Sequence, residues 1–280
     1  MSKKQSDTST APGGVEIKVM PPSFDFLKSI QIWQGAPKIG KTSTAAALGP
    51  VAEKLGIDGV NPFFMLFEPG SGGVEIEGTS ETCDCGNKKG CDVCEGTGVK
   101  RKILQSLEEI DEWFRWAADS DYNPIILDTG DAMYQTIADS VCVQMGILNP
   151  SMSDHGIAWV NIFDEVREKL AILTGSGKSV IILMHVYYQE KRVSGGSMTV
   201  ATFNVSGKTR PYLAGLADQI LHFGIVPDDE GEGDKHVITT TAEAGIEAGD
   251  HWGVLPDELD RGDSPEEGAE AILKCFYEVE

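Results

Sequence analysis

The sequence of 280 residues lacks the features that would place it in or across a membrane. It has no uninterrupted apolar run of the roughly 18 residues that a membrane-spanning helix needs. Its first residues, MSKKQSDTSTAPGG, contain no apolar segment typical of a secretory signal. We therefore expect no membrane partner, a cytoplasmic location and a disordered lead over residues 1–20. In a reducing compartment the six cysteines are expected to bind metal or stay free rather than form disulfides.

Basic residues are also scarce, with 23 Lys and Arg against 44 Asp and Glu and a net charge of −21. Residues 228–280 alone carry 17 acidic and three basic side chains. This charge balance argues against binding of duplex DNA through a broad basic face, so any nucleic-acid contact must come from a local patch of basic residues. The acidic end is either a solvated, solubilising surface or a regulatory segment.

The most informative stretch is residues 29–48. A short β-favouring segment, SIQIW, precedes GAPKIGKT at residues 35–42, which fills every fixed position of G-x-x-x-x-G-K-[ST], and an Ala-rich helix follows. The glycines let backbone N–H groups turn toward an anion, and the helix N-terminus adds positive potential. Lys41 is then placed for the β- and γ-phosphates and Thr42 for Mg²⁺. The predicted nucleotide-binding residues are Gly35, Ala36, Pro37, Lys38, Ile39, Gly40, Lys41, Thr42 and Ser43.

The rest of the chain alternates apolar runs with helical patterns, which predicts an α/β fold with a mostly parallel sheet. Buried strands are expected at residues 62–67, 124–128 and 179–184, and further strands at 218–226 and 236–241. Helices are expected at residues 104–118, 131–145, 154–173 and 269–279, and a hairpin at 187–203. Gly49-Pro50 predicts a break or kink after the first part of the helix, with a last turn at residues 51–55 as the alternative to its end there. The aromatic residues of 154–173, Trp159 among them, are assigned to the core. We expect one ATPase domain at 21–260 with an insertion at 74–102, followed by an acidic segment with a short helix at 261–280.

Three polar residues follow the predicted buried strands, where ligands of open α/β sheets lie. Asp128, after three aliphatic residues, fits a Walker B carboxylate that holds Mg²⁺ together with Thr42. The next residue is Thr129, where many such ATPases have a catalytic glutamate, so the general base must lie elsewhere. Glu68 is the best candidate, although a plain loop carboxylate is the alternative. His185 either senses the γ-phosphate or is structural. The predicted catalytic set is Lys41, Glu68, Asp128 and His185.

The insertion contains four cysteines in twelve residues, in the pattern C-x-C, five residues, then C-x₂-C. Four thiolates at this spacing, with glycines between them, predict a structural tetrahedral zinc site formed by Cys83, Cys85, Cys91 and Cys94. The second half, CDVCEGTG, resembles one repeat of the DnaJ-type zinc module. An iron–sulfur cluster or free thiols are the alternatives. Cys142 and Cys275 are expected to be buried packing residues. The insertion also carries the most basic stretch of the chain, a candidate nucleic-acid contact: Lys88, Lys89, Lys100, Arg101 and Lys102.

The order of these motifs resembles the RecA-type ATPase core, and in particular the phage-encoded RecA-like ATPases linked to single-strand annealing and recombination. The segments that carry the resemblance are GAPKIGKT, IILD, VIILMH and GKTRPYLAGLADQIL, within residues 25–260. The resemblance implies a RecA-like P-loop fold, ATP hydrolysis with Mg²⁺, assembly into a homo-oligomer in the host cytoplasm, and single-stranded DNA as partner. A single-strand binding protein or another recombination protein is a further partner that it allows.

In such assemblies a basic residue from one subunit often completes the neighbouring site. Lys208 and Arg210 are either such residues or exposed loop charges. The stretch 247–256 offers only His251 where relatives often carry basic residues. For DNA, Tyr187 and Tyr188 beside Lys191 and Arg192 on the hairpin provide stacking surfaces and charge. A zinc-containing P-loop nucleoside kinase and a nucleotide-gated assembly module with slow hydrolysis remain as alternative functions.

Overall fold

The structure is a computed structural model that describes residues 24–69, 74–83, 99–193, 196–205, 207–227, 233–243 and 245–277. Its centre is a sheet with the strand order β11-β9-β8-β1-β6-β5-β2. The five strands from β8 to β2 run parallel, as predicted, whereas β9, β11 and β10 add antiparallel pairs at the β8 side. These strands are β1 (Ile30–Gly35), β2 (Phe63–Leu66), β5 (Ile125–Asp128), β6 (Val180–Val193), β8 (Gln219–Pro227), β9 (Asp234–Thr239), β10 (Gly249–Asp250) and β11 (Glu258–Asp260).

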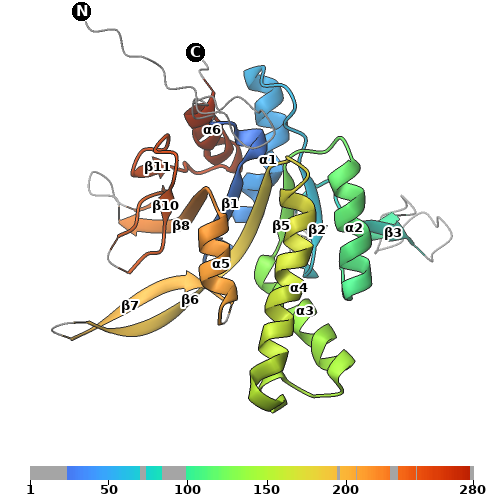
Figure 1. The fold of residues 1–280 in the computed structure, drawn as a ribbon. Coiled ribbons are helices and arrows are strands. Elements are labelled where there is room, and N and C mark those ends of the chain that lie inside the picture. Colours follow the sequence, from blue (N-terminus) through green and yellow to red (C-terminus); the bar gives the residue numbers. More distant parts are fainter. Residues whose placement is uncertain are drawn as a thin grey trace, which may run out of the picture.

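Helices cover both faces of this sheet (Figure 1). On one face α1 packs against α6, and on the other α4 packs against α2 and α3. The helices are α1 (Lys41–Leu55), α2 (Leu107–Asp119), α3 (Gly130–Met145), α4 (Ile157–Thr174), α5 (Thr209–Leu216) and α6 (Pro265–Phe276), and short 3₁₀ turns lie at Phe26–Lys28, Pro150–Met152 and Asp154–Gly156. None of the helices in the described ranges is long and apolar enough to cross a bilayer.

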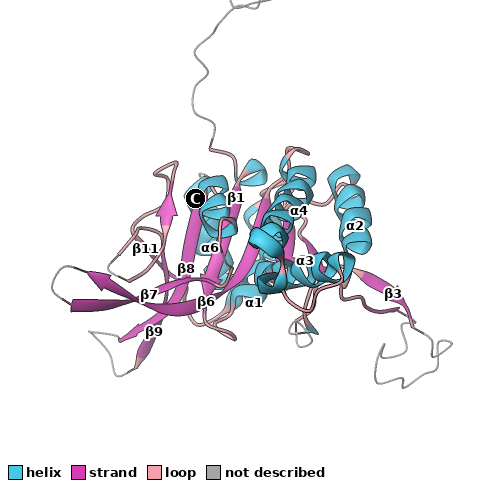
Figure 2. Cartoon of the chain, turned by 60° about the horizontal axis from the view of Figure 1, so that its bottom comes forward, coloured by secondary structure: helices cyan, strands magenta, loops and turns pink. Residues whose placement is uncertain are grey.

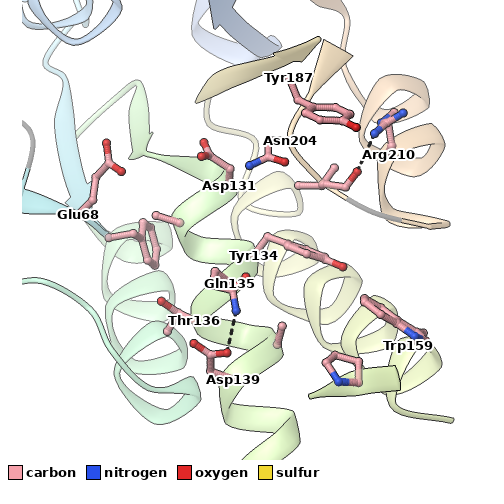
Figure 3. A pocket seen from close by; sticks show the side chains of 15 residues that line it. Glu68, Asp131, Tyr134, Gln135, Thr136, Asp139, Trp159, Tyr187, Asn204 and Arg210 are labelled. Carbon is pink, nitrogen blue, oxygen red and sulfur yellow. Dashed lines mark hydrogen bonds between the residues drawn. The ribbon is translucent and has the colours of Figure 1, made fainter. Parts of the chain in front are cut away.

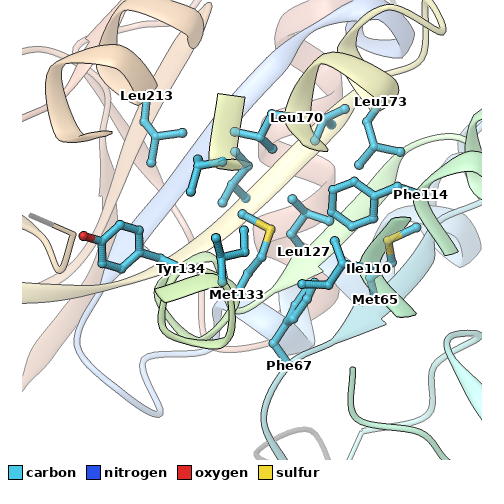
Figure 4. Packing of buried hydrophobic residues seen from close by; sticks show 14 of the residues in the cluster. Met65, Phe67, Ile110, Phe114, Leu127, Met133, Tyr134, Leu170, Leu173 and Leu213 are labelled. Atoms are coloured by element: carbon cyan, nitrogen blue, oxygen red, sulfur yellow. The ribbon is translucent and has the colours of Figure 1, made fainter. Parts of the chain in front are cut away.

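Alternate residues of the central strands point to opposite faces and so build two hydrophobic clusters. On β6, Ile182 and Met184 join the cluster under α2, α3 and α4, whereas Ile181 and Leu183 join the cluster under α1 and α6. Figure 4 shows part of the first cluster, in which side chains from the helices close over the sheet. Because both faces of these strands are buried, their sequences read as continuous apolar runs rather than as alternating patterns.

The segment 261–280 contains α6, whose Ala269, Ile272 and Leu273 are fully buried. A Ser264–Glu267 capping box starts this helix, since each side chain accepts from the backbone of the other residue. The predicted short helix of the acidic segment is therefore a three-turn helix of the core, and its Glu270 reaches Lys54 at the end of α1, with Oε2 at 4.0 Å from Nζ.

Three local expectations are corrected by the structure. Pro50 does not end the first helix: α1 runs through it to Leu55. The strand of residues 179–184 does not end at His185 but continues to Val193, because β6 leaves the sheet and pairs with β7 (Gly196–Phe203). Trp159 is not a core residue, since it is 40% exposed. It lies in the first turn of α4, which extends beyond the sheet and so has no strand beneath it (Figure 1).

Two hairpins extend away from the central sheet, as Figure 2 shows. One is formed by β6 and β7 in antiparallel register from Val186–Phe203 to Val193–Gly196. The other is formed by β3 (Ser80–Thr82) and β4 (Val99–Arg101) and forms the base of the predicted insertion. His185 directly precedes the paired part of the β6–β7 hairpin, so this hairpin is joined directly to a predicted catalytic residue. Glu68 precedes β3 by twelve residues.

Candidate nucleotide site

The phosphate loop connects the end of β1 to the first turn of α1. Gly35 must be glycine because a Cβ there would lie 2.6 Å from the carbonyl oxygen of Phe223 on the neighbouring β8. Lys38 and Gly40 have positive φ angles of 65° and 101°, which turn the loop back over the helix N-terminus. No side chain caps α1. Its N-terminal N–H groups are thus left for an anion.

Lys41 begins α1 and is only 5% exposed. Its Nζ donates to the carbonyl oxygens of Gly35 and Ala36, both at 3.0 Å, so the ammonium group lies inside the loop. Burial lowers the pKa of Lys41 to about 8, against the opposing influence of three carboxylates, of which Asp131 is the strongest. A buried ammonium with only carbonyl partners fits a phosphate site, because phosphate oxygens would supply the missing negative charge.

Asp128 ends β5 on the other side of the site and is 3% exposed. Thr42 donates its hydroxyl to Asp128, with Oγ1 at 3.3 and 3.4 Å from the two carboxylate oxygens. Burial raises the pKa of Asp128 to about 6, and the negative charge of Glu68 adds to this effect. Mg²⁺ is usually held by one or two carboxylates together with substrate phosphates, and the Thr42–Asp128 pair fits that donor set.

Glu68, Asp131 and His185 form a second group at the same edge of the sheet. His185 Nδ1 lies 3.1 Å from Asp131 Oδ2, and the His185 backbone N–H donates to Asp131 Oδ1 at 3.1 Å. His185 Nε2 lies 3.9 Å from Glu68 Oε1. The hydrogen bond to Asp131 raises the pKa of His185 despite partial burial. Burial would raise the pKa of Asp131, but its bonds from His185 outweigh this and lower it.

A cavity of about 430 Å³ brings these predicted residues together. It is lined by the loop and by Glu68, Asp128 and His185, and its volume is within the range of small-molecule sites. The expectations from the strand ends therefore agree with the observed positions. No local pattern predicted the bond between Asp131 and His185, because these residues, 54 positions apart in the chain, are brought together by the pairing of β5 with β6.

A larger cavity of about 700 Å³ shares Glu68 with the first, is also lined by Asp131, and extends toward the β6–β7 hairpin (Figure 3). Its far wall carries Tyr187 and Trp159, together with Arg210, which donates to the carbonyl oxygen of Val205 at 3.1 Å. Tyr187 and Arg210 are candidate functional residues from the sequence, whereas Trp159 is assigned there to the core, so its place in this wall is missed. Arg210 lines the cavity and is half-buried, whereas Lys208 is exposed.

The zinc prediction lies mostly outside the described residues. Of its four cysteines only Cys83, which is buried, is described, and Cys85, Cys91 and Cys94 are not. Within the described ranges, no group of three or more His, Cys, Asp or Glu side chains is arranged to hold a metal ion. Of the two single cysteines, Cys142 is buried as expected and Cys275 is partly buried.

The basic stretch beside the insertion is engaged in ion pairs. Lys100 Nζ lies 3.1 Å from Glu81, and Lys102 Nζ lies 2.6 Å from Glu109 and 3.5 Å from Glu81. Lys88 and Lys89 are outside the described ranges. The paired lysines are therefore a weaker candidate for a phosphate contact than their sequence position indicated.

The strand order around the loop defines the class of protein. The loop strand β1 lies between β6 and β8, and β6 separates it from β5, which carries Asp128. With the phosphate loop, the Thr42–Asp128 pair and a largely parallel sheet, this arrangement is that of a P-loop nucleoside triphosphatase core, consistent with the predicted RecA-like form.

Comparison with known proteins agrees with this class. Residues 28–252 match the family described as AAA domain, and the chain belongs to this family. No curated protein matches the chain. Among 264 matching chains of solved structure is a KaiC-like protein from the hyperthermophilic archaeon Pyrococcus horikoshii, with 10% sequence identity and a TM-score of 0.43. That match covers 86% of this chain and 88% of the other.

Proposed function

We propose that this protein hydrolyses ATP, with Glu68 as the general base. The observation that carries the proposal is the placement of Glu68 beside a buried Lys41 and a Thr42–Asp128 pair in one cavity. Lys41 would bind the β- and γ-phosphates, and Thr42 and Asp128 would hold Mg²⁺, which supplies charge neutralisation when bound. Glu68 would accept the proton of the attacking water.

His185 has a supporting role in this proposal. Its Nδ1 is fixed by Asp131 at 3.1 Å, which leaves Nε2 facing Glu68 at 3.9 Å. In this orientation a protonated His185 would donate a hydrogen bond to the γ-phosphate when ATP is bound and to Glu68 when it is not. Because β6 continues from His185 into the hairpin, a change of this hydrogen bond would alter the position of the hairpin.

We further propose that the partner at the hairpin is single-stranded DNA, bound by a homo-oligomer in phage recombination or single-strand annealing. Tyr187 and Tyr188 are 48% and 59% exposed on β6, and aromatic side chains of this kind provide stacking platforms for unpaired bases. The large cavity adds Trp159 and Arg210 on the side of Tyr187. Lys208, a single-strand binding protein and the four-cysteine zinc site remain predictions within this proposal.

The test is the ATPase rate of the full chain with no addition, with a single-stranded oligonucleotide, and with nucleosides, at low salt. Stimulation by the oligonucleotide, lost in a Tyr187→Ala/Tyr188→Ala variant that keeps its basal rate, supports the DNA proposal. Phosphorylation of a nucleoside would instead establish the kinase alternative. Slow hydrolysis that no addition changes would favour the nucleotide-gated assembly module.

The zinc prediction has its own test. Metal analysis of the purified chain should find about one zinc per chain, the ratio expected of one four-cysteine site, and Cys91→Ser/Cys94→Ser should release it. Hydrolysis should survive, because β3 and β4 leave and rejoin the core outside the nucleotide cavity. Iron with visible absorbance would assign a cluster instead, and no metal would leave free thiols.

A further inference from the structure

Arg261 is a buried arginine at the edge of the phosphate loop that neither the motifs nor the family match singles out. It follows β11 and precedes α6, and its backbone N–H donates to the carbonyl oxygen of His236 at 3.0 Å. The residue is 6% exposed. Arginine is rarely buried to this degree without an ionic partner.

The guanidinium group lies directly against the loop. A Cβ added to Gly40 would lie 2.7 Å from Arg261 Nη1 and 3.5 Å from its Cζ, so the arginine fills the space beside that glycine. The stem of Arg261 passes Gly268 of α6, where an added Cβ would lie 2.8 Å from Arg261 Cγ and 3.3 Å from Thr44. Two glycines thus leave room for this one side chain between α1 and α6.

No described residue neutralises the charge. Within the described ranges Arg261 forms no ion pair, and its Nε is buried without a hydrogen-bond partner. The acidic residues nearest in sequence are engaged elsewhere: Asp260 pairs with Lys235 at 3.3 Å, and Glu267 accepts from Asp263 and Ser264. A buried, unpaired cation costs free energy. An anion supplied by a ligand at this place would remove that cost.

We propose that Arg261 binds the phosphate chain of the nucleotide in the same subunit, as a second cation beside Lys41. This inference rests on the proposed function, because it takes the loop as the nucleotide site. The planar guanidinium, with several N–H donors, suits phosphate oxygens. It approaches from the α6 side, whereas Lys41 lies inside the loop against Gly35 and Ala36.

The proposal makes two predictions that a purely structural arginine would not satisfy together. Removing the charge while keeping the apolar stem, in Arg261→Met, should weaken ATP and ADP binding by about 10- to 100-fold, the range for charge-assisted hydrogen bonds. The same variant should keep or raise the melting temperature of the nucleotide-free protein, since it removes an uncompensated buried charge. Arg261→Lys, which keeps the charge but not the planar group, should lose less affinity than Arg261→Met.

The experiment measures ATP and ADP affinity by calorimetry and the melting temperature with and without nucleotide. Arg167→Met is the matched control, because Arg167 pairs with Asp164 at 3.2 Å on the exposed side of α4; it should leave affinity unchanged. Unaltered affinity in Arg261→Met, or a lower melting temperature without nucleotide, would overturn the proposal. If the wild-type chain binds no nucleotide, the proposed function fails as well, so the two failures are distinguishable.

Discussion

The charges at the nucleotide site and the charges at the base of the insertion are arranged in opposite ways. Lys102 is partly exposed and lies between two carboxylates, at 2.6 and 3.5 Å. Lys41 is buried, and within the described ranges its Nζ donates hydrogen bonds to two carbonyl oxygens at 3.0 Å and forms no ion pair. Asp128 is buried as well, and its hydrogen-bond partner is a hydroxyl group.

The pKa values follow the same division. Hydrogen bonding to Glu109 raises the pKa of Lys102, whereas burial lowers that of Lys41 to about 8. Each group at the insertion is thus stabilised in its charged form by the fold alone. Lys41 and Asp128, by contrast, have pKa values shifted by burial against their charged forms, which is typical of groups at a functional site.

The largest expected effect comes from the unpaired lysine. Lys41→Ala should reduce ATP hydrolysis by about 10² or more, because one positioned charge at the transferred phosphate is lost. The matched control is Lys102→Ala, which should hydrolyse ATP at the wild-type rate. Steady-state phosphate release measures both. A wild-type rate in Lys41→Ala would show that the loop is not the site of hydrolysis.

Glu68→Gln should slow turnover by about 10², the lower range for a general base, while ATP affinity stays close to that of wild type. The variant keeps the shape of the side chain and removes only the basic oxygen. Single-turnover kinetics and nucleotide titration separate the two quantities. Glu75→Gln, an exposed neighbour in sequence, is the control, and unchanged turnover in Glu68→Gln would transfer the role to Asp131.

Asp128→Asn should stabilise the nucleotide-free protein while slowing hydrolysis. The pKa of Asp128 is raised from 3.8 to about 6, so its contribution to stability is present below pH 3.8 and is lost as the pH rises through 6. Above pH 6 the substitution should add up to about 3 kcal/mol to the free energy of unfolding, at 1.36 kcal/mol per pKa unit. Near pH 4 the gain should vanish.

Denaturant unfolding at several pH values measures this effect. Asp111→Asn should behave in the opposite way, because hydrogen bonds from Arg115 and Lys169 lower the pKa of Asp111. The Asp111→Asn variant should be less stable than wild type at neutral pH, and this difference should disappear as the pH falls below the usual pKa of an aspartate. A destabilised Asp128→Asn at pH 8 would contradict the picture of an uncompensated site charge.

The smallest effect is expected at the insertion. Lys102→Ala should lower the free energy of unfolding by about 0.5 kcal/mol, a typical value for partly exposed ion pairs. High salt should reduce the difference because it screens such pairs. Denaturant titrations at low and high ionic strength provide the measurement. A difference that is large and insensitive to salt would mean that the cluster is a buried network.

Local sequence determined much of this protein. The phosphate loop and the buried strands before Glu68 and Asp128 were predicted, because each depends on residues close together in the chain. The parallel sheet was predicted from the alternation of such strands with helical segments. The helix of residues 154–173 was also predicted, although its first turn was assigned to the core. Periodicity shows that Trp159 shares a face with Ile162, but not that the sheet ends before it reaches Trp159.

The tertiary structure decided which charged groups distant in the chain have partners. Lys102 and Glu81 meet through the pairing of β3 with β4, and Asp131 meets His185 through the pairing of β5 with β6. Arg261 reaches Gly40 because α6 packs against α1. The sequence determines the chemical group that each side chain carries, and local spacing determines the form of the phosphate loop. Desolvation and pairing depend on contacts between distant segments, and these set the energy of every charge at the site.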